Sequence, residues 1–521
     1  MDKIIEKYIG AGRKKDVFGN LVLFEVPVGE IISVCEELHK KNSLPLKMIS
    51  ASDETAERGF FMLKYVFGVP GENVFLAPFI LVKDDFPSLT PAIHEASIYE
   101  RKIMTFFGLK PVGHPNLRTL ILHENWPADK YPLRKDFNWQ TRPALASNEF
   151  LFRKMDGEGV YEIPVGPVHA GIIEPGHFRF SVAGEEILML EPRLGYSHKG
   201  SEKLFEILPI RQKIKLSERI SGDSSFSHSL AFCQAVESLA KISVFDRAKY
   251  LRVIYSELER LANHLGDIGA IMLDTGFSFG GVPCARLREV VMMLNDELTG
   301  SRFLRGVNAA GGVLKDISQD AKEKIAGVLN KLNSEFLEII GFAENSSSLL
   351  NRLEDTGVLD RKIALDHGVL GVAARAVGIP RDARADYPYA AYGDLRPEVA
   401  VLTSGDVYSR FKVRVKEVQS SIGLVKDALS RMPAGEIMTK GADGAIVFEK
   451  GRCALGVVEG WRGDIVYLVS TDGRGEISRV DVRDPSFLNW TVLGYAGKGN
   501  VVPDFPLINK SFNLSYSGND L

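Results

Sequence analysis

The sequence LRVIYSELERLANHL at residues 251–265 spaces its apolar side chains along one face of an α-helix. The spacing is i, i+3, i+4 and i+7, which produces an apolar stripe on a helix of about 3.6 residues per turn. The same spacing recurs at residues 283–298, before Gly300, and at 321–353 and 407–429. These segments predict a bundle of long helices in the second part of the chain.

Strand patterns lie on both sides of these helices. Strands are expected at residues 21–27, 60–67 and 73–82, and helices at 31–40 and 92–107, the latter ending at Gly108. Short strands are expected within 160–191 and, around a turn at 472–475, at 456–458, 464–469 and 477–482. Polar residues 138–159, with Pro143 and Gly157, are typical of a linker. We therefore predict an α+β protein with an N-terminal α/β unit at 1–137, a linker at 138–159 and a mainly helical unit with small sheets at 160–521.

Composition excludes several classes of protein. The 521 residues are 45% hydrophobic and 25% charged, with a formal net charge of −3, which is typical of a globular protein and gives no electrostatic reason to expect nucleic acid as a partner. No apolar run approaches the roughly 18–20 residues that a membrane span requires. The start of the chain, Met1-Asp2-Lys3, lacks the apolar core of a signal peptide, so we expect the protein in the cytoplasm.

The four cysteines are far apart and form no CxxC pair. They are Cys35, Cys233, Cys284 and Cys453. A disulfide framework is therefore not expected, nor is an iron–sulfur or structural zinc site built from this chain alone.

Two series of motifs resemble known families. The first runs from Glu100-Arg101 through Gly108 to GHPNLR at 113–118 and PLRKDF at 132–137. This series is similar to the C subunit of respiratory complex I. The resemblance implies an α/β domain of the C-subunit type at the N-terminus.

The second series covers the remainder of the chain. Its motifs are GPVH at 166–169, EPGHF at 174–178, GYSHKGSEK at 195–203, ERI at 218–220, SHSLAFCQAVE at 227–237, ELERLANHL at 257–265, GDVYSR at 405–410, EGWRG at 459–463 and DPSF at 484–487. The series resembles the D subunit of complex I and the large subunit of NiFe hydrogenases. As a fused C/D chain, the protein is most similar to energy-converting hydrogenases of the formate-hydrogenlyase type.

The resemblance also shows what is missing. In the hydrogenases, four thiolates hold nickel and iron, and the matching positions here are Ser221, Ser224, Ser486 and Asn489. Hydroxyls and an amide bind such metals poorly, so we expect neither a NiFe centre nor any other cofactor on this chain. In place of the metal, the resemblance implies a polar pocket lined by Glu174, His177, Glu218, Asp223, His228, Arg462 and Asp484. Within that pocket, Glu174 matches a proton-transfer carboxylate and Arg462 an arginine that overhangs the substrate. The alternative is that these side chains form a hydrogen-bond network that only holds the helices together.

Quinone chemistry is the other expectation that the D subunit raises. His169 or His177 matches the histidine that binds the quinone headgroup. The partner tyrosine has no counterpart, because residues 220–228 contain none and Phe226 has no hydroxyl. Quinone reduction in the usual manner is therefore not expected.

The resemblance implies the large subunit of an ion-translocating oxidoreductase complex on the cytoplasmic side of the membrane. Its expected partners are a B-type small subunit with a 4Fe-4S cluster, a ferredoxin-like I-type subunit, a membrane H-type subunit and antiporter-like subunits. The electron acceptor stays open among a quinone, a sulfur compound or none. The alternative is a scaffold that couples a redox module to the membrane arm without chemistry of its own.

Overall fold

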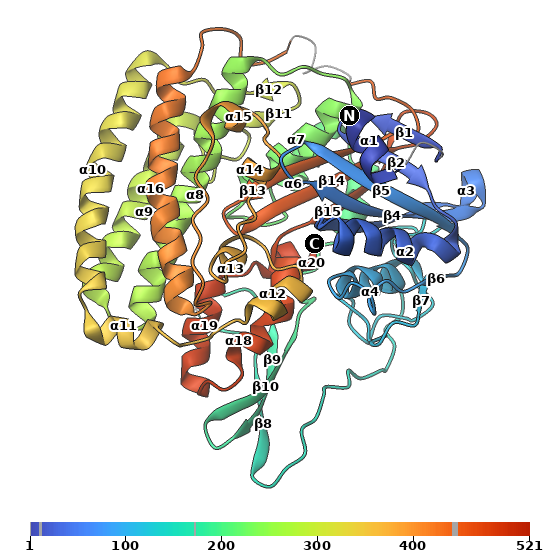
Figure 1. Cartoon of the computed structure of the whole chain (residues 1–521), viewed down its shortest axis with the longest axis horizontal. Helices are drawn as coiled ribbons and strands as arrows, with labels where there is room; N and C mark the ends of the chain where they lie inside the picture. The colour runs from blue at the N-terminus through green and yellow to red at the C-terminus, as the bar shows by residue number, and fades with distance from the viewer. Residues whose placement is uncertain (1, 10–12, 171–172, 440–445) are drawn as a thin grey trace.

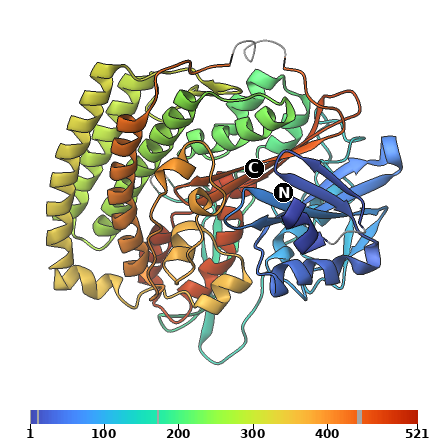
Figure 2. The same ribbon diagram turned by 45° about the horizontal axis from the view of Figure 1, so that its top comes forward.

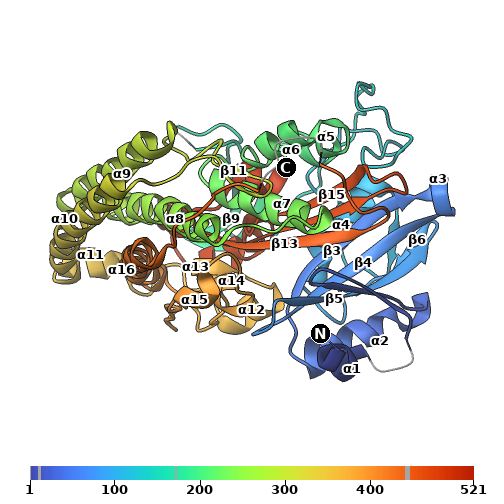
Figure 3. The same ribbon diagram turned by 90° about the horizontal axis from the view of Figure 1, so that it is seen from above.

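The computed structural model describes residues 2–9, 13–170, 173–439 and 446–521. Long helices lie side by side at one end of the molecule and the N-terminal sheet lies at the other (Figure 1). A second sheet runs between them, as the view from above also shows (Figure 3). The predicted α+β class is confirmed. Within the described residues, no helix is both long and apolar enough to cross a membrane.

The N-terminal sheet has five strands in the order β1-β2-β5-β4-β3, and only β2 and β5 pair in parallel. Its strands are β1 (Lys15–Phe18), β2 (Leu21–Glu25), β3 (Leu46–Glu54), β4 (Phe60–Val69) and β5 (Val74–Val82). The helices and short strands around it are α1 (Asp2–Ile9), α2 (Ile31–Glu36), α3 (Thr55–Arg58), α4 (Ala96–Phe107), β6 (Asp85–Pro87) and β7 (Lys110–Val112). Helix α4 ends at Gly108, as predicted, where φ is +72°.

Strand β3 is absent from the sequence prediction, and its burial explains why. It carries polar side chains such as Lys47 and Ser50, which are almost fully buried. Both face carboxylates of the C-terminal part, since Lys47 lies 2.8 Å from Asp464 and Ser50 donates to Asp481. A buried polar residue interrupts the hydrophobic pattern on which strand prediction depends.

Residues 113–159 contain no helix or strand and run along the molecule as an extended arm. The arm is nevertheless attached to the rest of the molecule. The Arg153 amide donates to the Glu191 carboxylate of β10 (Glu186–Arg193) at 2.8 Å, and the guanidinium of Arg193 lies over the Phe150 ring. The linker at 138–159 stays a prediction. Beyond the arm, β8 (Val160–Val165), β9 (His177–Ala183) and β10 form an antiparallel sheet that projects downward in Figure 1.

The bundle confirms the long helices. They are α8 (Asp246–Asp274), α9 (Ser278–Thr299), α10 (Gln319–Glu344) with α11 (Ser347–Leu353), and α16 (Val407–Arg431), and the bundle also contains α7 (Ser225–Leu239). The predicted helix at 321–353 is two helices, because Ser346 caps α11 by accepting the Leu349 amide. The apolar spacing does not predict α7, which is buried on nearly all sides and so has no polar face to mark its period.

The central sheet connects the two ends of the molecule (Figure 2). Its antiparallel strands are β13 (Cys453–Gly460), β14 (Gly463–Thr471) and β15 (Ile477–Arg483). Alternate residues face opposite ways, so Val457 and Val466 join the core of the N-terminal sheet while Val458 and Ile465 join the core of the bundle. The sheet is therefore buried on both faces.

Short elements complete the fold around the central sheet. They are α5 (Ser201–Ile207), α6 (Ile210–Ser217), α12 (Arg361–Asp366), α13 (Gly371–Arg375), α14 (Ala383–Asp386), α15 (Tyr392–Leu395), α17 (Ser486–Asn489), α18 (Leu493–Gly497), α19 (Phe505–Phe512), α20 (Tyr516–Asp520), β11 (Asn308–Ala309) and β12 (Gly312–Val313). Of these, α17 and α20 lie against the site described next.

Candidate functional site

An ion pair lies at the centre of the site, in which the Arg462 side chain is almost fully buried and the Asp223 side chain is 34% exposed. Asp223 is in the turn before α7, and Arg462 is at the tip of the hairpin between β13 and β14. Two nitrogens of the Arg462 guanidinium each lie 2.7 Å from one oxygen of Asp223. Burial alone would raise the pKa of Asp223, but the guanidinium outweighs it and holds that pKa below its usual value. The Arg462 guanidinium also stacks 3.8 Å from the centre of the Trp461 ring.

Serine hydroxyls surround this pair. The Ser221 hydroxyl lies 3.0 Å from the Asp223 carboxylate, to which it can donate, and 2.8 Å from the Ser515 hydroxyl, with which it shares a second hydrogen bond. The Ser515 amide in turn donates to the Ser486 hydroxyl at 2.9 Å. Ser224 makes a longer contact with Asp223, at 3.4 Å. Three of the four positions that match hydrogenase thiolates therefore lie in one hydrogen-bonded cluster.

The fourth position, Asn489, has a different role. Its side-chain oxygen accepts the Leu370 amide at 2.9 Å, and its side-chain nitrogen donates to the Leu370 carbonyl at 3.1 Å. This two-point contact attaches α17 to the segment before α13. Asn489 is thus not bonded to the serine cluster.

A second buried chain joins Asp484, His228 and Tyr467. One nitrogen of the His228 ring lies 3.0 Å from the Asp484 carboxylate, and the other lies 3.0 Å from the Tyr467 hydroxyl. Asp484 also accepts the Ser486 amide at 2.7 Å, which links this chain to the serines. Burial would raise the pKa of Asp484, but its hydrogen bond with His228 and the positive charge of Arg462 lower it.

Glu174 reaches the site through α20, where its carboxylate accepts the Ser517 amide at 3.2 Å. The histidines proposed for quinone lie beside the β8–β10 sheet instead. His169 lies 2.7 Å from the Gly176 carbonyl, and His177 lies 3.3 Å from the Gly166 carbonyl. Burial lowers the pKa of His177. Neither histidine is bonded to the serine cluster.

Glu218 lies on the far side of the 221–225 turn. Its carboxylate accepts the Gly306 amide at 2.6 Å, and burial raises its pKa. The structure therefore bonds Asp223, Arg462, Asp484 and His228 into one network with the serines, and joins Glu174 to it through α20. Glu218, His169, His177 and Asn489 stand outside that network.

Several side chains at the site were missed by the sequence analysis. Ser515 and Tyr467 lie far from their partners in the sequence, so no local pattern marks them. The Lys199 ammonium, near the carbonyls of Ile220 and Ser517, was within the GYSHKGSEK motif. Glu259 was within the ELERLANHL motif but had no assigned role.

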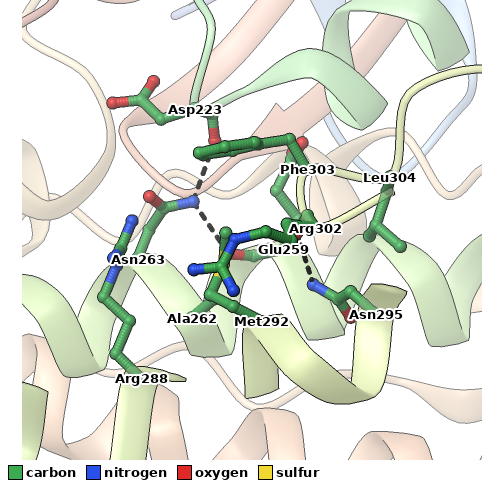
Figure 4. Close-up of a pocket in the computed structure, with 10 residues that line it drawn as sticks. All are labelled: Asp223, Glu259, Ala262, Asn263, Arg288, Met292, Asn295, Arg302, Phe303 and Leu304. Carbon is green, nitrogen blue, oxygen red and sulfur yellow. Dashed lines mark hydrogen bonds between the residues drawn. The ribbon is translucent and has the colours of Figure 1, made fainter. Parts of the chain in front are cut away.

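A small cavity of about 10 Å³ lies beside Asp223 (Figure 4). Glu259, Asn263, Arg288 and Arg302 are among the residues that line it. The Asn263 side chain lies between its two bonding partners, donating to the carbonyls of Asp223 at 2.8 Å and of Glu259 at 2.9 Å. The cavity has room for about one water molecule.

The donor groups at this site do not fit a nickel–iron centre. The four positions hold three hydroxyls and an amide that already bond to protein groups, and soft thiolates are what such a centre requires. The cysteines lie elsewhere, and burial raises the pKa of the Cys284 thiol to about 12. Across the described ranges, no group of three or more His, Cys, Asp or Glu side chains is arranged to hold a metal.

Comparison with known proteins identifies the family. The model "Respiratory-chain NADH dehydrogenase, 30 Kd subunit" matches residues 24–143, and "Respiratory-chain NADH dehydrogenase, 49 Kd subunit" matches 274–453 and 444–520. Formate hydrogenlyase subunit 5 of Escherichia coli is 34% identical over 95% of this chain and 88% of its own length. The C/D subunit of the NADH-quinone oxidoreductase of Phocaeicola vulgatus is 30% identical over 74% of this chain and 78% of its own length.

A solved structure shares the fold. It is the "membrane-bound sulfane sulfur reductase (MBS), an archaeal respiratory membrane complex", with a TM-score of 0.66 and 27% identity. The match covers 70% of this chain and 99% of that chain. The resemblance found in the sequence is confirmed: the chain belongs to the family of fused 30 kDa (C) and 49 kDa (D) subunits found in complex I-like NADH dehydrogenases and related hydrogenases.

Proposed function

We propose that this chain is the redox-active large subunit of a membrane-associated, ion-translocating oxidoreductase complex and that it works without a nickel–iron centre. Electrons arrive from a 4Fe-4S cluster in a B-type partner subunit. Other partners are a ferredoxin-like I-type subunit, a membrane H-type subunit and antiporter-like subunits, and the chain lies on the cytoplasmic side of the membrane. The family and its relatives support this assignment.

The observation that carries the proposal is the Arg462–Asp223 pair among the serines. The buried guanidinium of Arg462 is paired with the half-buried carboxylate of Asp223, to which the Ser221 hydroxyl also donates. Leaving the buried charge of Arg462 without this partner is strongly unfavourable. In this proposal, the Asp223 carboxylate and the Arg462 guanidinium take the place that the metal has in the hydrogenases.

The serines offer a route for protons to this charge. Hydroxyls both donate and accept, so a row of them passes a proton by successive exchange. Ser221 is bonded to Ser515 at 2.8 Å, and Ser515 lies 3.4 Å from the Ser517 hydroxyl. The backbone amide of Ser517 holds the Glu174 carboxylate at the end of this row but does not itself pass a proton. In this proposal the Glu174 carboxyl gives protons to the Ser517 hydroxyl, and Asp223, which is ionised at rest, accepts one only transiently while an acceptor is reduced.

The acceptor is a quinone or a sulfur compound bound beside this network. A relative named for quinone reduction and a structural neighbour named for sulfane sulfur reduction support these two classes. The site has no counterpart of the family tyrosine within residues 220–228, so a quinone would require a different hydroxyl, and Tyr467 is bonded to His228.

The experiment measures oxidation of reduced methyl viologen by the purified complex, with a short-chain quinone, polysulfide or protons as the acceptor. We expect turnover with one of the first two, no hydrogen evolution and no stoichiometric nickel by elemental analysis. Asp223→Asn and Glu174→Gln should each lower turnover by about tenfold or more, within the range seen for proton-transfer groups, with all subunits retained.

Arg252→Met provides the matched control. Arg252 is as buried as Arg462 and forms an ion pair with Glu237, away from the site. Its loss should lower the stability of the complex, with turnover per intact complex unchanged. Stoichiometric nickel that is lost in Ser221→Ala, or full turnover in both site variants, would contradict the proposal.

A coupling subunit without its own chemistry is the second candidate, and Glu202 favours it. Its carboxylate bonds Lys102 of the N-terminal unit at 2.8 Å, and Arg479 and the Val482 amide of the central sheet. Glu202 directly follows residues 195–201. Backbone amides of that segment are bonded to Asp520 and Leu521, which lie beside the site. This candidate predicts that turnover in the site variants falls only as far as subunits are lost.

A further inference from the structure

Glu259 is a buried carboxyl at the N-terminus of α7 that the proposed function does not use. It projects from α8, is 6% exposed and borders the cavity beside Asp223. One oxygen accepts the Phe226 amide at 2.6 Å, and the other accepts the Ser227 amide at 3.1 Å and faces the Ser227 hydroxyl. The first turn of a helix carries backbone amides without helical partners, so this carboxyl caps α7 from another helix.

We propose that Glu259 is a proton-binding residue of the site, whose protonation is coupled to the charge of Asp223. This inference rests on the proposed function. A proton taken up at Asp223 from the serine row removes the negative charge there, and Glu259 then releases a proton toward the cavity. One proton is bound and one released, so the charge of the site is conserved.

The contacts of Glu259 suit both of its protonation states. As a carboxylate it accepts three hydrogen bonds. When it is protonated, its new O–H has a partner in the Ser227 hydroxyl, because a serine hydroxyl accepts as well as donates. The hydrogen bond between Glu259 and Ser227 is then kept with its direction reversed, and only the hydrogen of the Ser227 hydroxyl has to turn to another acceptor.

Charges of both signs lie around Glu259. Burial, with a smaller contribution from the charge of Asp223, raises its pKa to about 7 against the lowering effect of the three hydrogen bonds. On the other walls, Arg288 of α9 and Arg302 border the same cavity, and Arg302 is bonded to Glu289. Arg305 lies near Ser225 at the start of α7. Loss of the negative charge on Asp223 therefore favours the ionised form of Glu259.

Infrared spectroscopy of the full chain tests the inference without any turnover. Burial raises the pKa of both Glu259 and Glu459 to about 7, so we expect the protonated-carboxyl absorption that titrates near pH 7 to lose one component in Glu259→Gln and the other in Glu459→Gln. The midpoint of the Glu259 component should move to lower pH in Asp223→Asn and to higher pH in Ser227→Ala, which keeps Glu259 but removes a bond to its ionised form.

Glu100→Gln is the control, since Glu100 is also buried and bonded by Ser88, Thr90 and a backbone amide, but in the N-terminal unit. It should leave the titration near pH 7 in place. An undiminished amplitude near pH 7 in Glu259→Gln, or an unmoved midpoint of the Glu259 component in Asp223→Asn, would overturn the inference. The turnover assay tests the proposed function independently of this titration. Full turnover of Asp223→Asn and Glu174→Gln would contradict the proposed function.

Discussion

At the scale of single residues, the raised pKa of Glu259 gives the protein a pH dependence of known sign. Between an ordinary pKa near 4.5 and the folded value near 7, the folded state binds one more proton than the unfolded chain. Stability from this group is complete below the ordinary value and is lost as pH rises to the folded value. The loss amounts to about 3 kcal/mol in the free energy of unfolding.

Glu259→Gln should remove that dependence. Relative to wild type, the variant should gain stability as pH rises from 5 to 8, because its neutral amide has no charge to bury. Urea unfolding at both pH values, followed by far-UV circular dichroism, measures the difference. Glu323→Gln changes an exposed carboxyl on α10, and its free energy of unfolding should equal that of the wild type at both pH values. Parallel pH profiles for wild type and Glu259→Gln would show that Glu259 titrates normally.

At the scale of elements, the position of α7 depends on its close approach to β13. A β-carbon built on Gly456 would lie 1.9 Å from the Ala231 carbonyl oxygen, so backbone of α7 occupies the space that an alanine would need. Since α7 carries the amides that bond Glu259 and begins beside Asp223, the fit of this helix on the central sheet also places the site.

Gly456→Ala should therefore lower the free energy of unfolding by about 1–3 kcal/mol, as overpacking usually does. Gly423→Ala is the matched control, because Gly423 is exposed in α16 with open space around it. That change should raise stability by about 0.5–1 kcal/mol through helix propensity. Thermal unfolding of the two variants should shift in opposite directions, and equal melting temperatures would contradict the packing argument.

At the scale of the whole molecule, the two ends of the chain share one buried sheet. Val457 and Val466 of the central sheet pack in the core of the N-terminal sheet. Lys47 of β3 is paired with Asp464, which Arg483 also contacts at 3.0 Å. Separating the ends would expose this core and these charges together, and buried charges that lose their partners are strongly destabilising.

Limited proteolysis should cut first within the predicted linker at 138–159, whose side chains are mostly exposed. The two fragments should nevertheless elute together in size-exclusion chromatography, because the shared core stays buried. Asp464→Asn leaves Lys47 and Arg483 facing a neutral group. The two fragments of this variant should therefore separate at a lower denaturant concentration than the fragments of the wild type. First cleavage within α8, or separation of the fragments in native buffer, would contradict this organisation.

The sequence by itself determined the family, the fold class and the long helices. Motif order and apolar spacing are local properties, so residues 251–265, 283–298 and 407–429 were sufficient to predict α8, α9 and α16. The loss of all four thiolate positions was also visible in the sequence. Only tertiary structure decided what those positions do now, because Ser221 meets Ser515, 294 residues away, while Asn489 bonds backbone instead. Strand β3 and helix α7 were not predicted, for one physical reason. Segments distant in the sequence bury the polar side chains of β3 and nearly every face of α7, and local periodicity does not depend on such contacts.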